Sequence, residues 1–245
     1  EMLQLDDTIY NESETQKPFV NESQWTQYQL DQYATTEEVV QNIDKLRIVG
    51  AFVGIHYFVA DAQGNAATIE FLDGKPVVHF QKTLPVAALS NDPYDKLLEK
   101  SADWGQDPLA GQWRRTSERR FAIAARGLTQ SLPAQDIFDQ VRLNGLAWDA
   151  IFEPTQWNIL YETTSGQITF QTRTSPRAKS ISLAEVDFSP GAPVLVLDMN
   201  SDFEGSARPY LKRYSDEFNA QLIWQNRFLL GKKKCQQALE YGQTF

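Results

Sequence analysis

The sequence has very few of the side chains that hold metal ions or form cross-links. It contains one cysteine, Cys235, and two histidines, His56 and His79, among its 245 residues. A single cysteine excludes an internal disulfide and any zinc site built from several cysteines. The histidines lie on predicted strands without the spacing of metal ligands, so we interpret them as strand-face residues with local hydrogen bonds. We therefore predict no metal and no cofactor.

Positive charge is scarce as well. The chain has 23 lysines and arginines against 32 aspartates and glutamates, a net charge of −9. A protein that follows nucleic-acid phosphates needs a basic surface, so this balance argues against a nucleic-acid partner and favours neutral or cationic partners. No apolar run approaches the length needed to cross a bilayer, so we expect no membrane span. With 42% hydrophobic residues, the chain can fill the core of one large domain or of two small ones.

The most informative stretch runs from Phe52 to Asn91. It consists of short apolar runs rich in β-branched and aromatic residues, interrupted at Gln63-Gly64-Asn65 and at Asp73-Gly74. Such runs joined by tight turns predict a meander of antiparallel strands. Its last strand is expected at Val86 to Leu89, where the sequence is too apolar to alternate and should be covered on both faces. Asn91 then lies just beyond this strand, at the rim of a core.

Helices are predicted on both sides of the meander. Before it, Ser23 can cap a helix, and Thr35 with Glu38 forms a capping box for a second one. The first helix has apolar residues at helical spacing, namely Trp25, Tyr28 and Leu30. After the meander, further helices are expected at residues 94–100, from Ser117, at residues 133–148 and at residues 206–230. Residues 157–161 and 167–172 predict a hairpin, and residues 178–183 a third strand.

On its own, the Asn91-Asp92-Pro93 sequence has an ordinary explanation, because Asn and Asp before Pro are common where a strand gives way to a helix. The order of the segments around it points further. A strand ending in Ala-Asp, a Gly-Asn turn, an Ile-Glu-Phe strand, an Asp-Gly turn and a segment leading to Leu-Ser-Asn-Asp-Pro-Tyr closely resemble the choloylglycine hydrolase family of N-terminal-nucleophile hydrolases. This family includes bile salt hydrolases and penicillin V acylases, and its Leu-Thr-Asn-Ser-Pro-like motif supplies an oxyanion-hole asparagine. The resemblance makes Asn91 a candidate catalytic residue.

The same resemblance implies two more catalytic candidates. The opening Glu-Met-Leu-Gln-Leu-Asp segment is similar to one in Gram-negative members, and Gln4 falls where bile salt hydrolases carry a second oxyanion-hole asparagine. The family also has a serine-arginine-phenylalanine-type element whose arginine reaches the active site, and Arg120 before Phe121 matches it. An acyl or phenoxy group needs an apolar aromatic pocket, for which three aromatic residues are candidates. These are Trp25, Tyr94 and Trp157.

The fold implied by the resemblance is α+β: an αββα sandwich of two antiparallel sheets between helix layers, as a single domain over residues 1–245. The resemblance begins after the family segment that carries the nucleophilic cysteine, and residue 1 is Glu. We therefore expect the first strands to be missing, which would expose apolar sheet edges. A partner is expected in consequence, namely an N-terminal segment or chain that carries the cysteine.

The implied function is hydrolysis of linear non-peptide amide bonds, as in penicillin V, N-acyl homoserine lactones or conjugated bile salts. For a Gram-negative-like sequence the first two are favoured, together with a periplasmic or secreted location; otherwise the protein would be cytoplasmic. A homo-oligomer is compatible with the resemblance, although the connection from Asn91 to Arg120 is shorter than in bile salt hydrolases, which form tetramers through a loop there. The alternative is a catalytically inactive protein that keeps the fold and binds an amide ligand. A hydrolase with another nucleophile is a third hypothesis, for which no Ser-His-Asp arrangement is visible.

Overall fold

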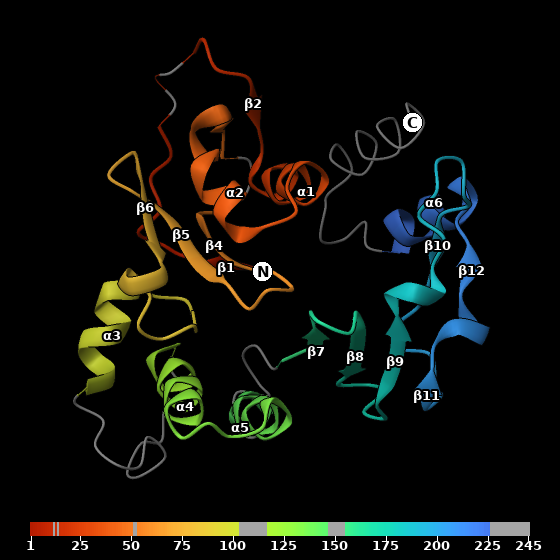
Figure 1. Cartoon of the computed structure of the whole chain (residues 1–245). Helices are drawn as coiled ribbons and strands as arrows, with labels where there is room; N and C mark the ends of the chain where they lie inside the picture. Colours follow the sequence, from red (N-terminus) through yellow and green to blue (C-terminus); the bar gives the residue numbers. More distant parts are fainter. Residues whose placement is uncertain (12, 14, 51–52, 103–116, 147–154, 226–245) are drawn as a thin grey trace. The chain divides into compact units, whose positions relative to one another are not determined.

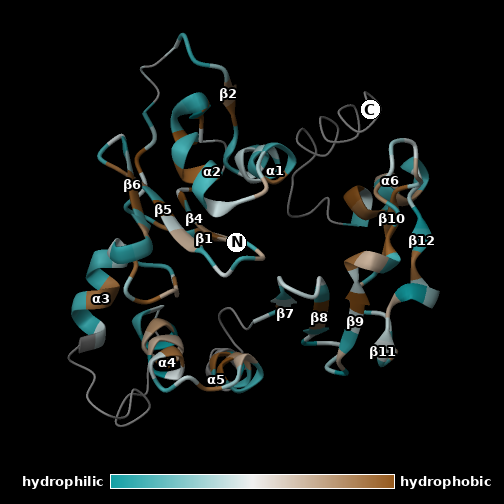
Figure 2. Cartoon of the chain, in the orientation of Figure 1, coloured by the Kyte–Doolittle hydropathy of each residue, from teal (hydrophilic) through white to brown (hydrophobic). Residues whose placement is uncertain are grey.

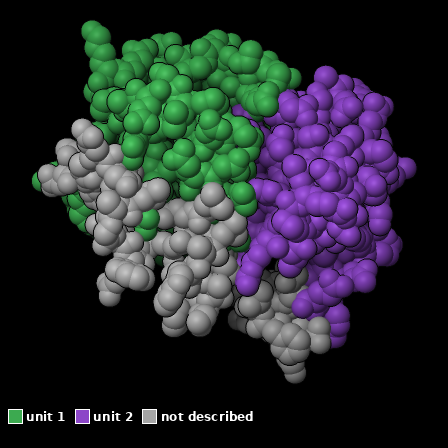
Figure 3. Space-filling view, turned by 90° about the horizontal axis from the view of Figure 1, so that it is seen from below, with its two compact units in different colours: residues 1–155, 162–165 green, residues 156–161, 166–245 purple. Residues whose placement is uncertain are grey.

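The computed structural model of the chain is shown in Figure 1 and describes residues 1–11, 13, 15–50, 53–102, 117–146 and 155–225. The chain divides into two compact units (Figure 3). The first comprises Glu1–Thr155 with Glu162–Ser165, and the second comprises Gln156–Tyr161 with Gly166–Phe245. Each unit has its own four-stranded sheet and core. The prediction of a single domain over residues 1–245 stays a prediction.

The sheet of the first unit contains the predicted meander. Its strands are β1 (Met2–Gln4), β4 (Ile55–Ala60), β5 (Ala66–Leu72) and β6 (Lys75–Phe80), in the order β1-β4-β5-β6 and antiparallel throughout. The β5–β6 turn has positive φ at Asp73 (52°) and Gly74 (74°), as a two-residue hairpin turn requires. Gln4 lies opposite Ile55, so β1 brings the start of the chain alongside the meander.

The prediction of a fourth meander strand at Val86 to Leu89 is wrong. After β6 the chain forms a short 3₁₀ helix, η2 (Gln81–Thr83), and residues 84–93 lie outside any helix or strand. The Tyr94 hydroxyl donates to the carbonyl of Val86 at 2.7 Å and lies 3.2 Å from its N–H. Because a side chain takes both backbone groups of Val86, they are not available to a neighbouring strand. Asn91 is nevertheless at the rim of the core, since Ser90 is buried and Asn91 is exposed.

Two helices cover one face of this sheet (Figure 1). They are α1 (Glu22–Gln32) and α2 (Thr36–Gln41), followed by the 3₁₀ helix η1 (Ile43–Lys45). The predicted capping box of α2, Thr35 with Glu38, is confirmed, whereas α1 is capped by Asn21 rather than by Ser23. The core between helices and sheet consists of Trp25, Val39, Ile43, Ile48, Ile55, Tyr57 and Ile69. In Figure 2 both helices carry mostly hydrophilic residues, as expected for helices with one buried face.

The buried face of α1 is partly polar. Its buried residues are Glu22, Trp25 and Gln29, at intervals of three and four. Leu30 is 72% exposed, whereas its neighbour Gln29 is buried. A short parallel pair, β2 (Phe19–Val20) with β3 (Arg47–Ile48), flanks the two helices.

Three further helices complete the first unit: α3 (Tyr94–Ala102), α4 (Ser117–Thr129) and α5 (Ala134–Leu146). They correspond to the first three of the four helices predicted after the meander, and residues 147–148 of the third lie outside the described residues. Tyr94 and Leu97 of α3 pack with Phe121 of α4 and with Ala88 in a second core. Helix α4 contacts both α3 and α5, and Gly127 is the point where α4 meets the Ile137 side chain of α5. The start of α4 is thereby held close to the start of α3.

The second unit has a sheet of β7 (Trp157–Glu162), β8 (Gln167–Thr172), β9 (Lys179–Ser182) and β11 (Gly205–Ser206), in the order β11-β9-β8-β7. The remaining elements are the pair β10 (Leu195–Val196) and β12 (Lys212–Arg213), the 3₁₀ helices η4 (Leu183–Glu185) and η5 (Arg208–Tyr210), and α6 (Asp216–Gln225). The predicted hairpin and third strand are confirmed. The predicted helix over residues 206–230 is wrong at its start, because η5, which contains Pro209, and β12 precede α6. Residues 226–230 lie outside the described residues.

Helices and largely antiparallel sheets confirm the α+β class, and the stacking of the two sheets as a sandwich stays a prediction. In the described parts of the chain, no helix combines the length and the apolar character that crossing a membrane would require.

Candidate active site

The three residues predicted to be catalytic meet at Asn91. The Asn91 side chain donates from Nδ2 to the backbone carbonyl of Gln4 at 3.0 Å, and its Oδ1 accepts a hydrogen bond from Arg120 Nη2 at 2.7 Å. These groups come from β1, from the turn before α3 and from the first turn of α4, and are 87 and 29 residues apart in the sequence. The fold therefore fixes both the nitrogen and the oxygen of the exposed Asn91 side-chain amide.

The loop that carries Asn91 is attached directly to the helix that carries Arg120. Ser90 is 2% exposed, and its Oγ donates to the carbonyl of Ser117 at 2.8 Å and lies 2.9 Å from the Ser117 Oγ. Ser117 is the first residue of α4. Arg120 follows three residues later, so the Ser90–Ser117 contact brings its guanidinium within reach of Asn91. The neighbouring Arg119 is buried at 9% exposure.

Gln4 contributes to the site differently from the prediction. Its side-chain Nε2 donates to Asp6 Oδ1 at 2.9 Å, and the contact with Asn91 uses the backbone carbonyl. Because a carbonyl oxygen only accepts, it fixes which end of the Asn91 amide faces β1. A donor role for the Gln4 side chain stays a prediction.

The arrangement suits Asn91 to hydrogen-bond donation. Arg120 on Oδ1 draws electron density from the amide, which strengthens donation from Nδ2. The Nδ2 group has two hydrogens, and among the described residues Gln4 takes one of them. The other suits an oxygen that gains negative charge during a reaction.

An ionised carboxylate, Asp92, follows Asn91 directly. Burial acts to raise the pKa of Asp92, but hydrogen bonds from Ser117 and Lys96 and the charges of Lys96 and Lys100 lower it more, so the pKa lies below its ordinary value of 3.8. Lys96 Nζ donates to Asp92 Oδ1 at 3.2 Å, across the first turn of α3. These contacts connect the Asp92 carboxylate to α3 and to the first residue of α4.

Sequence reasoning missed a buried histidine–glutamate contact next to this loop. His56 Nδ1 lies 3.0 Å from Glu70 Oε1, and their side chains are 0% and 1% exposed. No described residue bonds to His56 Nε2, whereas His79 Nδ1 lies 3.2 Å from the carbonyl of Thr83. The sequence feature that could have revealed this contact is the charged Glu70 between Ile69 and Phe71 in a mostly apolar strand.

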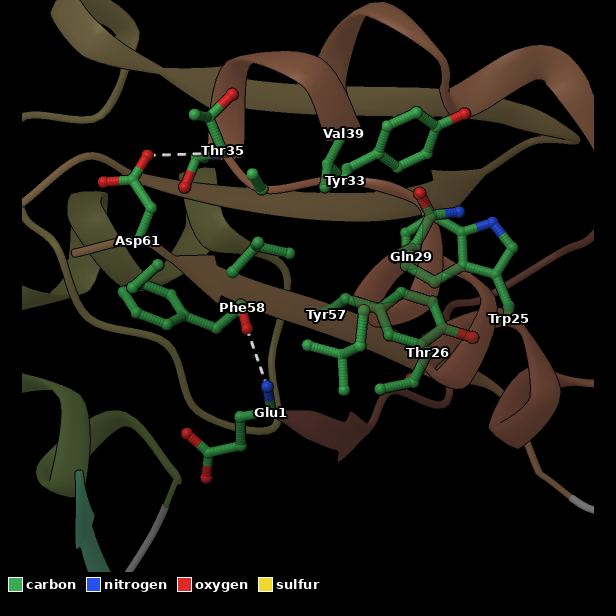
Figure 4. Close-up of a pocket in the computed structure, with 15 residues that line it drawn as sticks. Glu1, Trp25, Thr26, Gln29, Tyr33, Thr35, Val39, Tyr57, Phe58 and Asp61 are labelled. Atoms are coloured by element: carbon green, nitrogen blue, oxygen red, sulfur yellow. Dashed lines mark hydrogen bonds between the residues drawn. The ribbon is translucent and has the colours of Figure 1, made fainter. Parts of the chain in front are cut away.

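The three aromatic candidates for a substrate pocket differ in their surroundings. Trp25 is 1% exposed, packs against Tyr57 with 4.3 Å between the ring centroids, and lines a cavity of about 220 Å³ beneath α1 and α2 (Figure 4). None of the three catalytic candidates lines this cavity. Tyr94 is completely buried in the second core and offers no accessible surface to a substrate. Trp157 is 60% exposed on β7 of the other unit, and its pocket role stays a prediction.

No group of three or more histidine, cysteine, aspartate or glutamate residues in the described part of the chain is arranged to hold a metal ion. Cys235 lies outside the described residues.

Comparison with known proteins found a relative that matches part of the chain. No family model matches the chain. Over 100 residues it is 31% identical to a penicillin V acylase of Pectobacterium atrosepticum, a match that covers 37% of this chain and 26% of that protein. The chain thus spans about a quarter of the length of this curated relative.

Solved structures match over much more of the chain. A penicillin V acylase from Agrobacterium tumefaciens superposes with a TM-score of 0.74 at 23% identity, over 88% of this chain and 74% of that one. Two variants of the conjugated bile acid hydrolase of Clostridium perfringens superpose with TM-scores of 0.64 and 0.63, at 15% and 14% identity, over 87% of this chain and 73% of theirs. The chain therefore has the fold that penicillin V acylase and conjugated bile acid hydrolase share.

Proposed function

We propose that the chain belongs to the choloylglycine hydrolase family, in its Gram-negative-like subgroup, and forms the larger part of a hydrolase of linear non-peptide amide bonds. The observation that carries the proposal is the Asn91 amide, held between the Gln4 carbonyl and Arg120. The shared fold and the partial match to a penicillin V acylase support the same class.

In this proposal Asn91 stabilises the oxyanion. When a nucleophile adds to the substrate carbonyl, the oxygen gains a negative charge, and the second Nδ2 hydrogen of Asn91 donates to it. Arg120 keeps Oδ1 turned away from that oxygen, because a guanidinium donates and never accepts hydrogen bonds. The Gln4 carbonyl fixes the amide from its other end.

The nucleophile is an N-terminal cysteine on a segment that this sequence does not include. Its thiol proton passes to its own α-amine, whose ordinary pKa of about 7.7–8.0 suits transfer near neutral pH. The sulfur then bonds to the carbonyl carbon, the C–N bond breaks, and the amine leaves with that proton. Water attacks the resulting thioester, which releases the acid and restores the thiol.

For substrates we propose acylated amines, with penicillin V and N-acyl homoserine lactones ahead of conjugated bile salts. We further propose that the protein works in the periplasm or after secretion, and that a homo-oligomer is compatible with its surface. For an acyl pocket the aromatic candidates remain Trp25, Tyr94 and Trp157, of which Trp25 and Tyr94 are buried in this structure and Trp157 is exposed.

The test is substrate turnover by the protein purified together with everything that binds it. Penicillin V, an N-acyl homoserine lactone and a conjugated bile salt are each incubated with it, and the released amine is quantified by mass spectrometry. We expect release of amine from at least one substrate, and about a hundredfold slower release by Asn91→Ala with unchanged circular dichroism. Calorimetric binding of these compounds without release, in a sample that contains an N-terminal cysteine, would overturn the proposal in favour of an inactive binding protein.

A further inference from the structure

Glu70 is a buried carboxylate whose contacts all lead toward the Asn91 loop. It lies near the middle of β5 and is 1% exposed. Oε1 lies 3.0 Å from His56 Nδ1, and both carboxylate oxygens accept from the backbone N–H of Tyr94, at 3.1 and 3.2 Å. Burying an ionised carboxylate costs several kcal/mol unless it is paired and hydrogen-bonded, so its role has to lie in what it holds.

Glu70 holds the beginning of α3. Tyr94 is the first residue of that helix, and its N–H is one of the donors that no carbonyl within the helix can satisfy. A carboxylate at this end also interacts favourably with the helix dipole. Asn91 lies three residues before Tyr94, and on its other side Ser90 is fixed to Ser117. The segment that carries Asn91 is therefore short and attached at both ends.

His56 connects this anchor to the strand that receives Asn91. It lies on β4 opposite Leu3 of β1, so it is adjacent in the sheet to Gln4, whose carbonyl accepts from Asn91. Strand pairing and hydrogen bonds thus connect five residues in a ring that includes the Asn91 side chain and its acceptor. Its members are Gln4, His56, Glu70, Tyr94 and Asn91.

We propose that Glu70, held by His56, is a positioning residue for the oxyanion donor: it sets the Asn91 turn at the place where the side chain meets both Gln4 and Arg120. The inference rests on the proposed function for its catalytic meaning. Its geometric content, the placement of the Asn91 amide, can be measured separately.

The test is Glu70→Gln, which keeps the shape but puts an NH₂ group where one of the carboxylate oxygens accepts a hydrogen bond. We expect kcat for amide release to fall about tenfold with KM within about twofold, because substrate binding does not use Glu70. In an Asn91→Ala background the same substitution should lower kcat by less than about twofold, since the residue through which it acts is already gone. His56→Asn retains a donor near the position of Nδ1 and should keep more activity than His56→Leu.

Asp61→Asn is the matched control. Asp61 is 7% exposed, follows β4, and its Oδ2 accepts at 3.0 Å from the N–H of Thr36, the first residue of α2. It is therefore a second buried carboxylate at a helix start, but that helix does not carry Asn91. This variant should lose stability with unchanged kcat, whereas a loss of kcat equal to that of Glu70→Gln would mean that any such anchor has this effect.

A readout independent of activity separates this inference from the proposed function. The Asn91 side-chain amide is observed by ¹⁵N nuclear magnetic resonance in the wild type, Glu70→Gln and Asp61→Asn. We expect its signals to move in Glu70→Gln and to stay in place in Asp61→Asn, whether or not the protein hydrolyses any amide. Unmoved signals in a folded Glu70→Gln variant, or losses of kcat that multiply with those of Asn91→Ala, would overturn the inference.

Discussion

Replacing Asn91 with aspartate separates the structural from the catalytic role of its amide. The substitution preserves shape but turns Nδ2 into an oxygen that faces the Gln4 carbonyl, where the amide donates at 3.0 Å. The lost neutral hydrogen bond is worth about 0.5–1.5 kcal/mol. The other carboxylate oxygen remains beside Arg120, and an ion pair between partly exposed groups returns about 0.2–1 kcal/mol. The net change in the free energy of unfolding should therefore lie within about 1 kcal/mol of zero.

The effect on turnover should be much larger. Removal of one oxyanion donor lowers kcat by roughly a hundredfold to a thousandfold. Aspartate also places a negative charge where the oxyanion forms, so Asn91→Asp should be slower than Asn91→Ala although it is at least as stable. Urea unfolding and amine release measured on the same preparations give both quantities. An Asn91→Asp variant that turns over faster than Asn91→Ala would refute the donor role.

Three further predictions concern the framework. Burial acts to raise the pKa of Asp61, but the hydrogen bonds that its carboxylate accepts lower the pKa below 3.8. The stability that these hydrogen bonds give the wild type is therefore complete above pH 3.8 and declines as the pH falls through the lowered pKa. The urea midpoint of Asp61→Asn should lack this decline. Burial lowers the pKa of Lys179, and the charge of Arg177 lowers it further. The wild type should therefore gain stability relative to Lys179→Met as the pH rises from the lowered pKa to 10.5. Urea titrations that show the same dependence of stability on pH for both proteins would contradict this. In Gly127→Ala the new Cβ would lie 2.5 Å from Ile137 Cγ1. Thermal unfolding should therefore show a free energy of unfolding about 1–3 kcal/mol lower than in the wild type, although alanine has the better helix propensity. Adding Ile137→Ala should make the effect of Gly127→Ala smaller, because it removes the clashing side chain.

The sequence was sufficient for those features that depend on local patterns. The three confirmed meander strands follow from apolar runs rich in β-branched and aromatic residues and from the Asp73-Gly74 turn, and the α2 capping box from Thr35 and Glu38. Asn91 was identified because a motif and its order among the strands agree, and the structure brings Arg120 to it.

The features that the sequence did not predict depend on specific contacts between side chains and backbone groups. Val86 has strand-like neighbours, but the hydroxyl of Tyr94 occupies its backbone groups, and no propensity records that contact. From the sequence alone, Glu70 looks like an exposed residue of a strand. In the structure it is buried against His56 and the first residue of α3. Gln4 contacts Asn91 through its backbone carbonyl. Every residue has this group, so the residue type at position 4 does not predict the contact.

The proposal that this chain works with a nucleophile from another segment is tested most directly by intact mass and N-terminal sequencing of everything that co-purifies with it. We expect a second polypeptide, or a longer parent of this chain, that begins with cysteine and gains the mass of the acyl group on brief exposure to substrate. A single species that begins at Glu1 and gains no mass would contradict the proposal.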